Sequence, residues 1–213
     1  TTYVTGKAVE KACGELKEKI CALASDMLGC GPEQVEFAGR TVRRLDGKGQ
    51  VSLAQIADRS MCGNETALQA TCSHSSPISP PPFMVGMAEI ELDRETGVVE
   101  VLDYAAVVDC GIPINPALAR IQVEGGIVQG IGHTLMEDVT RTPKGKIRES
   151  SLFTYRLPTR LDTGRLNVEF EHSYEPTGPF GAKSIGEIVI NTPAPAIVQA
   201  IYRATGVWHR ELP

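Results

Sequence analysis

Hydrophobic residues recur at helical spacing over the first 28 positions of the chain. Between 6 and 28 they lie three or four positions apart, which predicts an amphipathic helix with one apolar stripe. Glycine and proline at 29–32 end the pattern, because glycine favours the turn after a helix and proline cannot continue it. The stripe consists of Val9, Ala12, Leu16, Ile20, Leu23, Ala24 and Met27.

The next fifty residues predict short elements and then a linker. Residues 35–52 read as short strands separated by turn signals at Gly39 and at 46–49. Ser52 is expected to cap a short helix that reaches about residue 60. The stretch 71–82 is rich in serine and proline and predicts an extended linker. We therefore expect an N-terminal lobe at 1–70 and a second lobe at 83–213.

The second lobe is expected to open with a hairpin. Residues 84–92 and 98–108 flank a five-residue loop that ends in glycine, a common hairpin connection. Residues 166–172 alternate as a further strand, and 143–145 form a turn. A last helix begins at Thr192-Pro193 and ends near Gly206. Because strands and helices occur in both lobes, the predicted fold class is α+β, with two small lobes of mixed sheets and packed helices.

A glycine-rich helix is expected between the hairpin and the next strand, from Asn115 to about residue 138. Asn115 suits the N-cap and Pro116 the first helical position. Apolar or small residues recur at 118, 121, 125, 128, 132 and 135, a helical period. Four internal glycines cost about 1 kcal/mol each relative to alanine. Either a flat ligand or tightly packed neighbouring backbone would explain them.

Residues 178–187 form the second unusual segment. Three glycines and one proline disfavour regular structure and allow the backbone to approach a ligand closely. Glu187 ends the segment, and a carboxylate at the tip of such a loop is a candidate general base. An exposed loop glutamate without a catalytic role is the alternative.

Composition narrows the range of functions. The chain has 213 residues, a formal charge of −5 and 42% apolar residues, which supports a real core. Basic residues form no stripe, so nucleic acid is not an expected partner. No apolar run approaches the roughly 20 residues of a membrane span, so we expect neither a membrane span nor a signal peptide. The first residue is threonine, and we expect the chain to be part of a larger protein.

The six cysteines predict neither disulfides nor a metal centre. None forms a Cys-x-x-Cys pair, so zinc and iron–sulfur spacings are missing from the sequence. Cys72 and His74 are two potential ligands in a linker, which is too few for a metal site. We expect no protein side chain to bind metal directly, and a reducing, cytoplasmic compartment.

The motifs as a series resemble the C-terminal half of the molybdopterin-binding subunit of the xanthine dehydrogenase / aldehyde oxidase family of molybdenum hydroxylases. No single motif carries the resemblance, but the matching stretches follow the family's order through most of 83–213. The opening residues 1–9 also resemble the family's entry into this half. The stretches are 93–97, 109–111, Asn115-Pro116, 122–126, 129–132, 155–158, 180–187 and 193–197.

The resemblance implies roles for individual residues. It makes Glu187 the catalytic base, which accepts a proton while an oxygen derived from water is transferred to an electron-poor carbon. It assigns Gln122 to a hydrogen bond with the pterin, although an exposed helical glutamine is the alternative. The remaining cofactor contacts would come from the backbone amides of Gly181, Ala182 and Lys183, and from Thr1 and Thr2 at the phosphate end.

The implied activity is hydroxylation of an N-heterocycle or an aldehyde. The cofactor would be molybdenum-molybdopterin, in its mononucleotide or cytosine dinucleotide form. Iron–sulfur and FAD groups would sit on other subunits or domains, and the rest of the molybdenum subunit would be a partner, with homo-oligomers also compatible. This chain alone is therefore expected to be inactive. A structural or assembly domain, a phosphate- or nucleotide-binding module on the 181–187 loop, and a general interaction domain remain alternatives.

Overall fold

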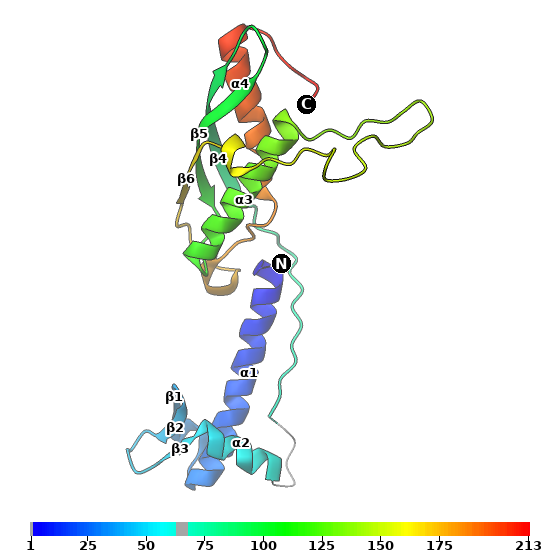
Figure 1. Ribbon diagram of the computed structural model, residues 1–213. Helices are drawn as coiled ribbons and strands as arrows, with labels where there is room; N and C mark the ends of the chain where they lie inside the picture. Colours follow the sequence, from blue (N-terminus) through cyan, green and yellow to red (C-terminus); the bar gives the residue numbers. More distant parts are fainter. Residues whose placement is uncertain (1, 63–67) are drawn as a thin grey trace. The chain divides into compact units, whose positions relative to one another are not determined.

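The computed structural model describes residues 2–62 and 68–213 and divides them into two compact units (Figure 1). One unit runs from Val4 to Pro77. The other comprises Ile78–Pro213 together with Thr2 and Tyr3, and the Tyr3 hydroxyl donates to Thr177 Oγ1 at 2.8 Å. Both units contain helices and a small sheet, which confirms the α+β fold class.

The unit Val4–Pro77 is built from two helices and one antiparallel sheet. Its core lies where the sheet and α2 meet the C-terminal part of α1, at Leu23, Ala24, Val42, Val51 and Ile56. Val9 is exposed, so the predicted apolar stripe is buried only toward its C-terminal end. The elements are α1 (Thr2–Leu28), η1 (Pro32–Gln34), β1 (Val35–Ala38), β2 (Thr41–Arg44), β3 (Gln50–Ser52) and α2 (Leu53–Cys62), with strand order β1-β2-β3.

The unit that follows Pro77 contains a second three-stranded sheet with strand order β4-β5-β6. The predicted hairpin is confirmed as the antiparallel pair β4 (Phe83–Leu92) and β5 (Val99–Asp109). The strand β6 (Arg165–Phe170) pairs with β5 in parallel, which requires a crossover, and α3 (Pro116–Leu135) lies within it. The remaining elements are η2 (Arg160–Asp162), η3 (Pro179–Gly181), η4 (Ile188–Ile190) and α4 (Pro193–Thr205).

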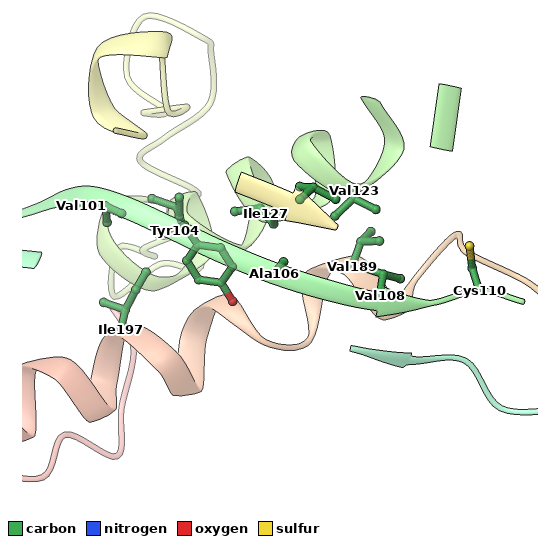
Figure 2. Packing of buried hydrophobic residues seen from close by; sticks show 11 residues of the cluster. Val101, Tyr104, Ala106, Val108, Cys110, Val123, Ile127, Val189 and Ile197 are labelled. Carbon is green, nitrogen blue, oxygen red and sulfur yellow. The ribbon is translucent and has the colours of Figure 1, made fainter. Parts of the chain in front are cut away.

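The core of this unit lies on one face of the sheet, between β5 and the helices α3 and α4. Figure 2 shows alternate residues of β5 directed toward the valine and isoleucine side chains of the covering elements. Tyr104 is fully buried, and its hydroxyl donates to Thr192 Oγ1 at 2.8 Å, at the start of α4. The labelled side chains are Val101, Tyr104, Ala106, Val108, Cys110, Val123, Ile127, Val189 and Ile197.

Close packing accounts for three of the four glycines in α3. A Cβ atom on Gly126 would lie 2.1 Å from Val189 Cγ2, and one on Gly130 would lie 2.6 Å from Pro193 Cγ. A Cβ atom on Gly132 would also clash, with Pro158 among its neighbours. These distances are too short for any side chain, so α3 can approach η4 and α4 only because positions 126 and 130 are glycine. Gly125 differs, because nothing lies within 4 Å of the position where its Cβ would be.

A hydrogen-bonded junction fastens the 173–183 segment to the end of β5. The Asp109 carboxylate accepts from Lys183 Nζ and from Ser173 Oγ, both at 2.6 Å, and from the Gly111 amide at 3.0 Å. The Ile112 amide donates to the Gly181 carbonyl at 2.8 Å. Burial opposes ionisation of Asp109, but the hydrogen bonds from Lys183, Ser173 and Gly111 outweigh it and hold the pKa of this carboxyl below its usual value.

We expect Gly126→Ala to destabilise the protein and Gly125→Ala not to. The Gly126 methyl would displace Val189, at a cost of about 1–3 kcal/mol for an overpacked core. The Gly125 methyl meets open space, and the better helix propensity of alanine stabilises by up to about 1 kcal/mol. Urea denaturation of the two variants measures both effects. Equal changes in the free energy of unfolding would contradict this account of α3.

We expect Asp109→Asn to lower stability in a pH-dependent way. The variant leaves the Lys183 ammonium without its carboxylate, at a cost of about 1.5–3 kcal/mol. Because the folded pKa of Asp109 is depressed, its contribution is fully present above the unfolded value of about 3.9 and is lost as pH falls through the folded pKa. The gap between wild type and variant should therefore close in acid. The exposed Asp138→Asn is the control, and a gap independent of pH would refute the assignment.

Candidate functional site

A cleft of about 730 Å³ lies between α3 and the chain that follows Ser184. One wall is a face of α3, and the other is formed by Gly186, Glu187 and the neighbouring η4. The two segments are more than fifty positions apart in the sequence, and the close packing of Gly126 on Val189 brings them together. The cleft is lined by Leu118, Ile121, Gln122, Gly125, Gly126, Gln129, Gly186, Glu187, Val189 and Ile190.

The helix α3 presents two different faces. Its inner face carries Val123, Ile127 and Ile131, all fully buried against the sheet. Its outer face begins with Leu118 and Ile121, which are 64% and 63% exposed although both are apolar. The periodic stripe that predicts the helix thus starts on the cleft side rather than in the core. An apolar wall of this kind suits a ligand or another protein segment.

Gln122 and Glu187 lie on opposite walls of the cleft, and one hydrogen bond joins these walls. The Gln122 side-chain amide donates through Nε2 to the Gly186 carbonyl at 3.1 Å, next to Glu187. Glu187 is exposed and immediately precedes η4, and its carbonyl accepts from the Ile190 amide. The described residues therefore place a carboxylate and an amide in the same cleft, with the carboxylate still exposed to water.

The backbone donors expected at 181–183 are largely committed elsewhere. The Ala182 amide donates to the Pro179 carbonyl at 3.0 Å, and the Lys183 amide donates to the Cys110 carbonyl at 2.7 Å. The Lys183 ammonium pairs with Asp109, with side chains 11% and 17% exposed. None of Gly181, Ala182 and Lys183 is among the described residues that line the cleft. In this structure the Ala182 and Lys183 amides therefore have protein acceptors, and their donation to a ligand stays a prediction.

Of the two N-terminal threonines, only Thr2 is among the described residues. Thr1 lies outside the described residues. Thr2 is exposed and is the first residue of α1, which begins four positions earlier than expected. It is not one of the described cleft residues, although its neighbour Tyr3 contacts Thr177 in the segment leading to the 178–187 loop.

Two features, one in the cleft and one in the 178–187 segment, were not predicted from the sequence. Gly125 is the α3 glycine that faces open space at the cleft, and its spacing does not distinguish it from the packed glycines. Phe180 is exposed and has a positive φ of 51°, a conformation that non-glycine residues rarely adopt. Backbone strain of this kind is concentrated at functional sites, and no residue pattern could have indicated it.

Within the part of the chain that the structure describes, no cluster of three or more histidine, cysteine or acidic side chains could hold a metal ion. No described helix is both long and apolar enough to cross a membrane. The cleft suits an extended cofactor, since Gly125 leaves space that a Cβ would fill and Gln122 offers a polar amide.

The family profile of the molybdopterin cofactor-binding domain matches residues 1–164. The matched range includes Gln122 and the whole of α3, whereas Glu187 lies beyond it.

Curated relatives cover nearly all of this chain. It is 35% identical over 212 residues to the "Probable hypoxanthine oxidase XdhD" of Escherichia coli (strain K12). This match spans 99% of this chain and 22% of the relative. It is 32% identical over 217 residues to the "Putative xanthine dehydrogenase molybdenum-binding subunit XdhA" of the same strain, which spans 100% of this chain and 29% of the relative. The chain thus corresponds to less than a third of these relatives' length.

A solved structure of an oxidoreductase has the same fold as this chain. The crystal structure of quinoline 2-oxidoreductase from Pseudomonas putida 86 superimposes with a TM-score of 0.82 at 25% identity, over 96% of this chain and 27% of the other. The fold that carries the cleft is therefore shared with that oxidoreductase, and this chain belongs to the molybdopterin cofactor-binding domain family.

Proposed function

We propose that this chain supplies the catalytic glutamate, Glu187, and one wall of the molybdopterin site in a molybdenum hydroxylase. The observation that carries the proposal is the single cleft in which Glu187, Gln122 and Gly125 meet although two distant segments provide them. The relatives named for hypoxanthine and xanthine favour an N-heterocyclic substrate over an aldehyde.

The proposed roles follow from the chemistry of each side chain. When bound, the molybdenum cofactor would supply the two-electron redox chemistry of hydroxylation. Glu187 would accept, at a carboxylate oxygen, the proton of the attacking oxygen that derives from water. Gln122 would hold the cofactor's polar edge while its Nε2 group fixes the Gly186 carbonyl. The open space at Gly125 would admit the cofactor close to the helix backbone.

We infer that the rest of the molybdenum subunit covers the open side of the cleft, beyond the two walls that this chain supplies. Ligand sites usually bury most of the ligand's surface, whereas Glu187 is exposed in this chain. We accordingly assign no activity to this chain alone, and we place the iron–sulfur and FAD groups on other subunits or domains. All six cysteines are free, which suits a reducing compartment such as the cytoplasm.

A phosphate-binding role of the 181–187 loop is less well supported than the role in a molybdopterin site. The amides of Ala182 and Lys183 bond within the protein, and Asp109 already neutralises the Lys183 ammonium. These groups are the ones that such a module would direct at a phosphate.

We expect Glu187→Gln in the assembled enzyme to lower kcat by at least about 10²-fold, with molybdenum content unchanged. The amide keeps the shape of the carboxylate but cannot accept the proton, and general-base catalysis contributes typically 10²–10⁴-fold. Steady-state kinetics and metal analysis of the same preparation test both statements. The control is Glu171→Gln, an exposed glutamate at the end of β6. Near-normal turnover of the Glu187 variant would remove the residue from the mechanism.

We expect Gln122→Ala to reduce cofactor occupancy or rate more than Gln129→Ala. An unpartnered polar group costs about 1–3 kcal/mol, which corresponds to a change of roughly fivefold to 150-fold. Gln129 is a matched control, since it is the same residue type on the same helix and cleft wall, two turns onward. Molybdenum content and kcat are the readouts. Equal and negligible effects would mean that this face of α3 does not hold the cofactor.

A further inference from the structure

A buried pair of hydroxyl groups attaches the start of α4 to the sheet. The Tyr104 hydroxyl, in the middle of β5, donates to Thr192 Oγ1 at 2.8 Å, and in Figure 2 the Tyr104 ring points toward the start of α4. Tyr104 is fully buried, and burial raises the pKa of its hydroxyl, so the proton stays in place for donation. Gly86 of β4 makes room for the pair, because a Cβ atom there would overlap both hydroxyl groups. Three elements therefore meet at this one hydrogen bond.

Thr192 does not cap the helix that follows it. It occupies the N-cap position of α4, where a threonine hydroxyl usually accepts from an amide of the first turn. Its backbone is helical there, and its side chain caps no amide. Pro193 and Pro195 also reduce the number of amides in that turn, since proline has no N–H group. The Thr192 hydroxyl therefore serves a partner 88 positions away instead of its own helix.

The segment that carries Glu187 is attached to β5 at both ends. At one end Lys183 pairs with Asp109. At the other end Thr192 accepts from Tyr104, which lies about 17 Å of strand before Asp109. The segment between the two attachments could extend to roughly 30 Å, so it has length to spare. Glu187 lies near its middle, four residues after the first attachment and five before the second, where loss of an attachment causes the largest movement.

The turn that follows Glu187 depends on these attachments. The backbone hydrogen bonds of η4 are long, at 3.3 and 3.2 Å, and a single 3-10 turn has poor hydrogen-bond geometry. Val189 packs on Gly126 in the middle of this turn and holds it against α3. The far end of the segment, at Thr192, is held by the Tyr104 hydroxyl.

We propose that Tyr104 is a positioning residue for Glu187 and acts through Thr192, by fixing the far end of the segment that carries the carboxylate. This role rests on the proposed function of Glu187 as general base. A base must lie within hydrogen-bond reach of the proton that it accepts. Tyr104 is fully buried and is not among the described residues that line the cleft, so its effect on the base is indirect.

Substitutions in the assembled enzyme test the role of the hydroxyl pair. Tyr104→Phe and Thr192→Val each remove one hydroxyl and keep nearly the same shape. We expect each to lower kcat per bound molybdenum at least about fivefold with KM unchanged, because displacement of a reacting group by about 1 Å can cost about 10²-fold. Thr192→Ser keeps the hydroxyl and should retain wild-type kcat. Tyr202→Phe is the matched control, since it makes the same change on α4, at a ring that stacks on Trp208.

A double variant and amide hydrogen exchange separate positioning from general destabilisation. The combination of Tyr104→Phe with Thr192→Val should lower kcat no further than either change alone, because both remove the same hydrogen bond. In the assembled enzyme, amide exchange in the peptide that spans 184–192 should become faster in each single variant. It should stay unchanged in Thr192→Ser and in Tyr202→Phe.

The outcomes distinguish this role from the proposed function. If Glu187→Gln is impaired but Tyr104→Phe and Thr192→Val keep wild-type kcat per molybdenum, the positioning role is overturned and the proposed base stands. The same holds if these variants lose only protein yield or molybdenum content, since the hydroxyl pair then merely stabilises the fold. Normal turnover of Glu187→Gln removes the base itself, and the positioning role with it.

Discussion

The close approach of α3 to the chain after Glu187 is the constraint on which the candidate site depends. At Gly126 and Gly130 no side chain separates the helix from Val189 and Pro193. Gly126 and Val189 both line the cleft, so their contact sets the distance between its walls. A helix that carries four glycines gives up roughly 4 kcal/mol of intrinsic propensity relative to alanine. Tertiary packing must supply that stability, and the fully buried Val123, Ile127 and Ile131 provide it on the same helix.

Two further contacts hold the ends of the segment that carries Glu187. Before the cleft, Lys183 is fixed to Asp109 at the end of β5. After it, Thr192 accepts from the buried Tyr104 hydroxyl in the middle of the same strand. Between these two points the chain crosses the cleft, and Gln122 bonds it to α3 at Gly186. The position of Glu187 is therefore determined by the sheet and by α3 rather than by its own loop.

Local signals in the sequence predicted the elements, whereas contacts between distant residues decided the details of the site. The Asn115 cap and the hairpin loop at 93–97 were predictable because neighbouring residues determine them. The separation of Gly125 from Gly126 was not, since it depends on Val189 more than sixty positions away. The ion pair between Lys183 and Asp109 was not predictable either, because 74 positions separate the two residues. The early start of α1 likewise follows from burial of Tyr3 against Thr177, a contact that no local pattern reveals.

The exposure of Glu187 bears directly on the role of general base that we propose for it. A general base works best when water is excluded, because solvent competes for the proton and screens the charges around it. This chain positions the carboxylate with a strand, a helix and an ion pair, yet leaves its outer side and the apolar Leu118 and Ile121 exposed. The residues of this chain therefore position the Glu187 carboxylate without excluding water from it. Our proposal leaves the exclusion of water to further chain, since the relatives are more than three times as long as this chain.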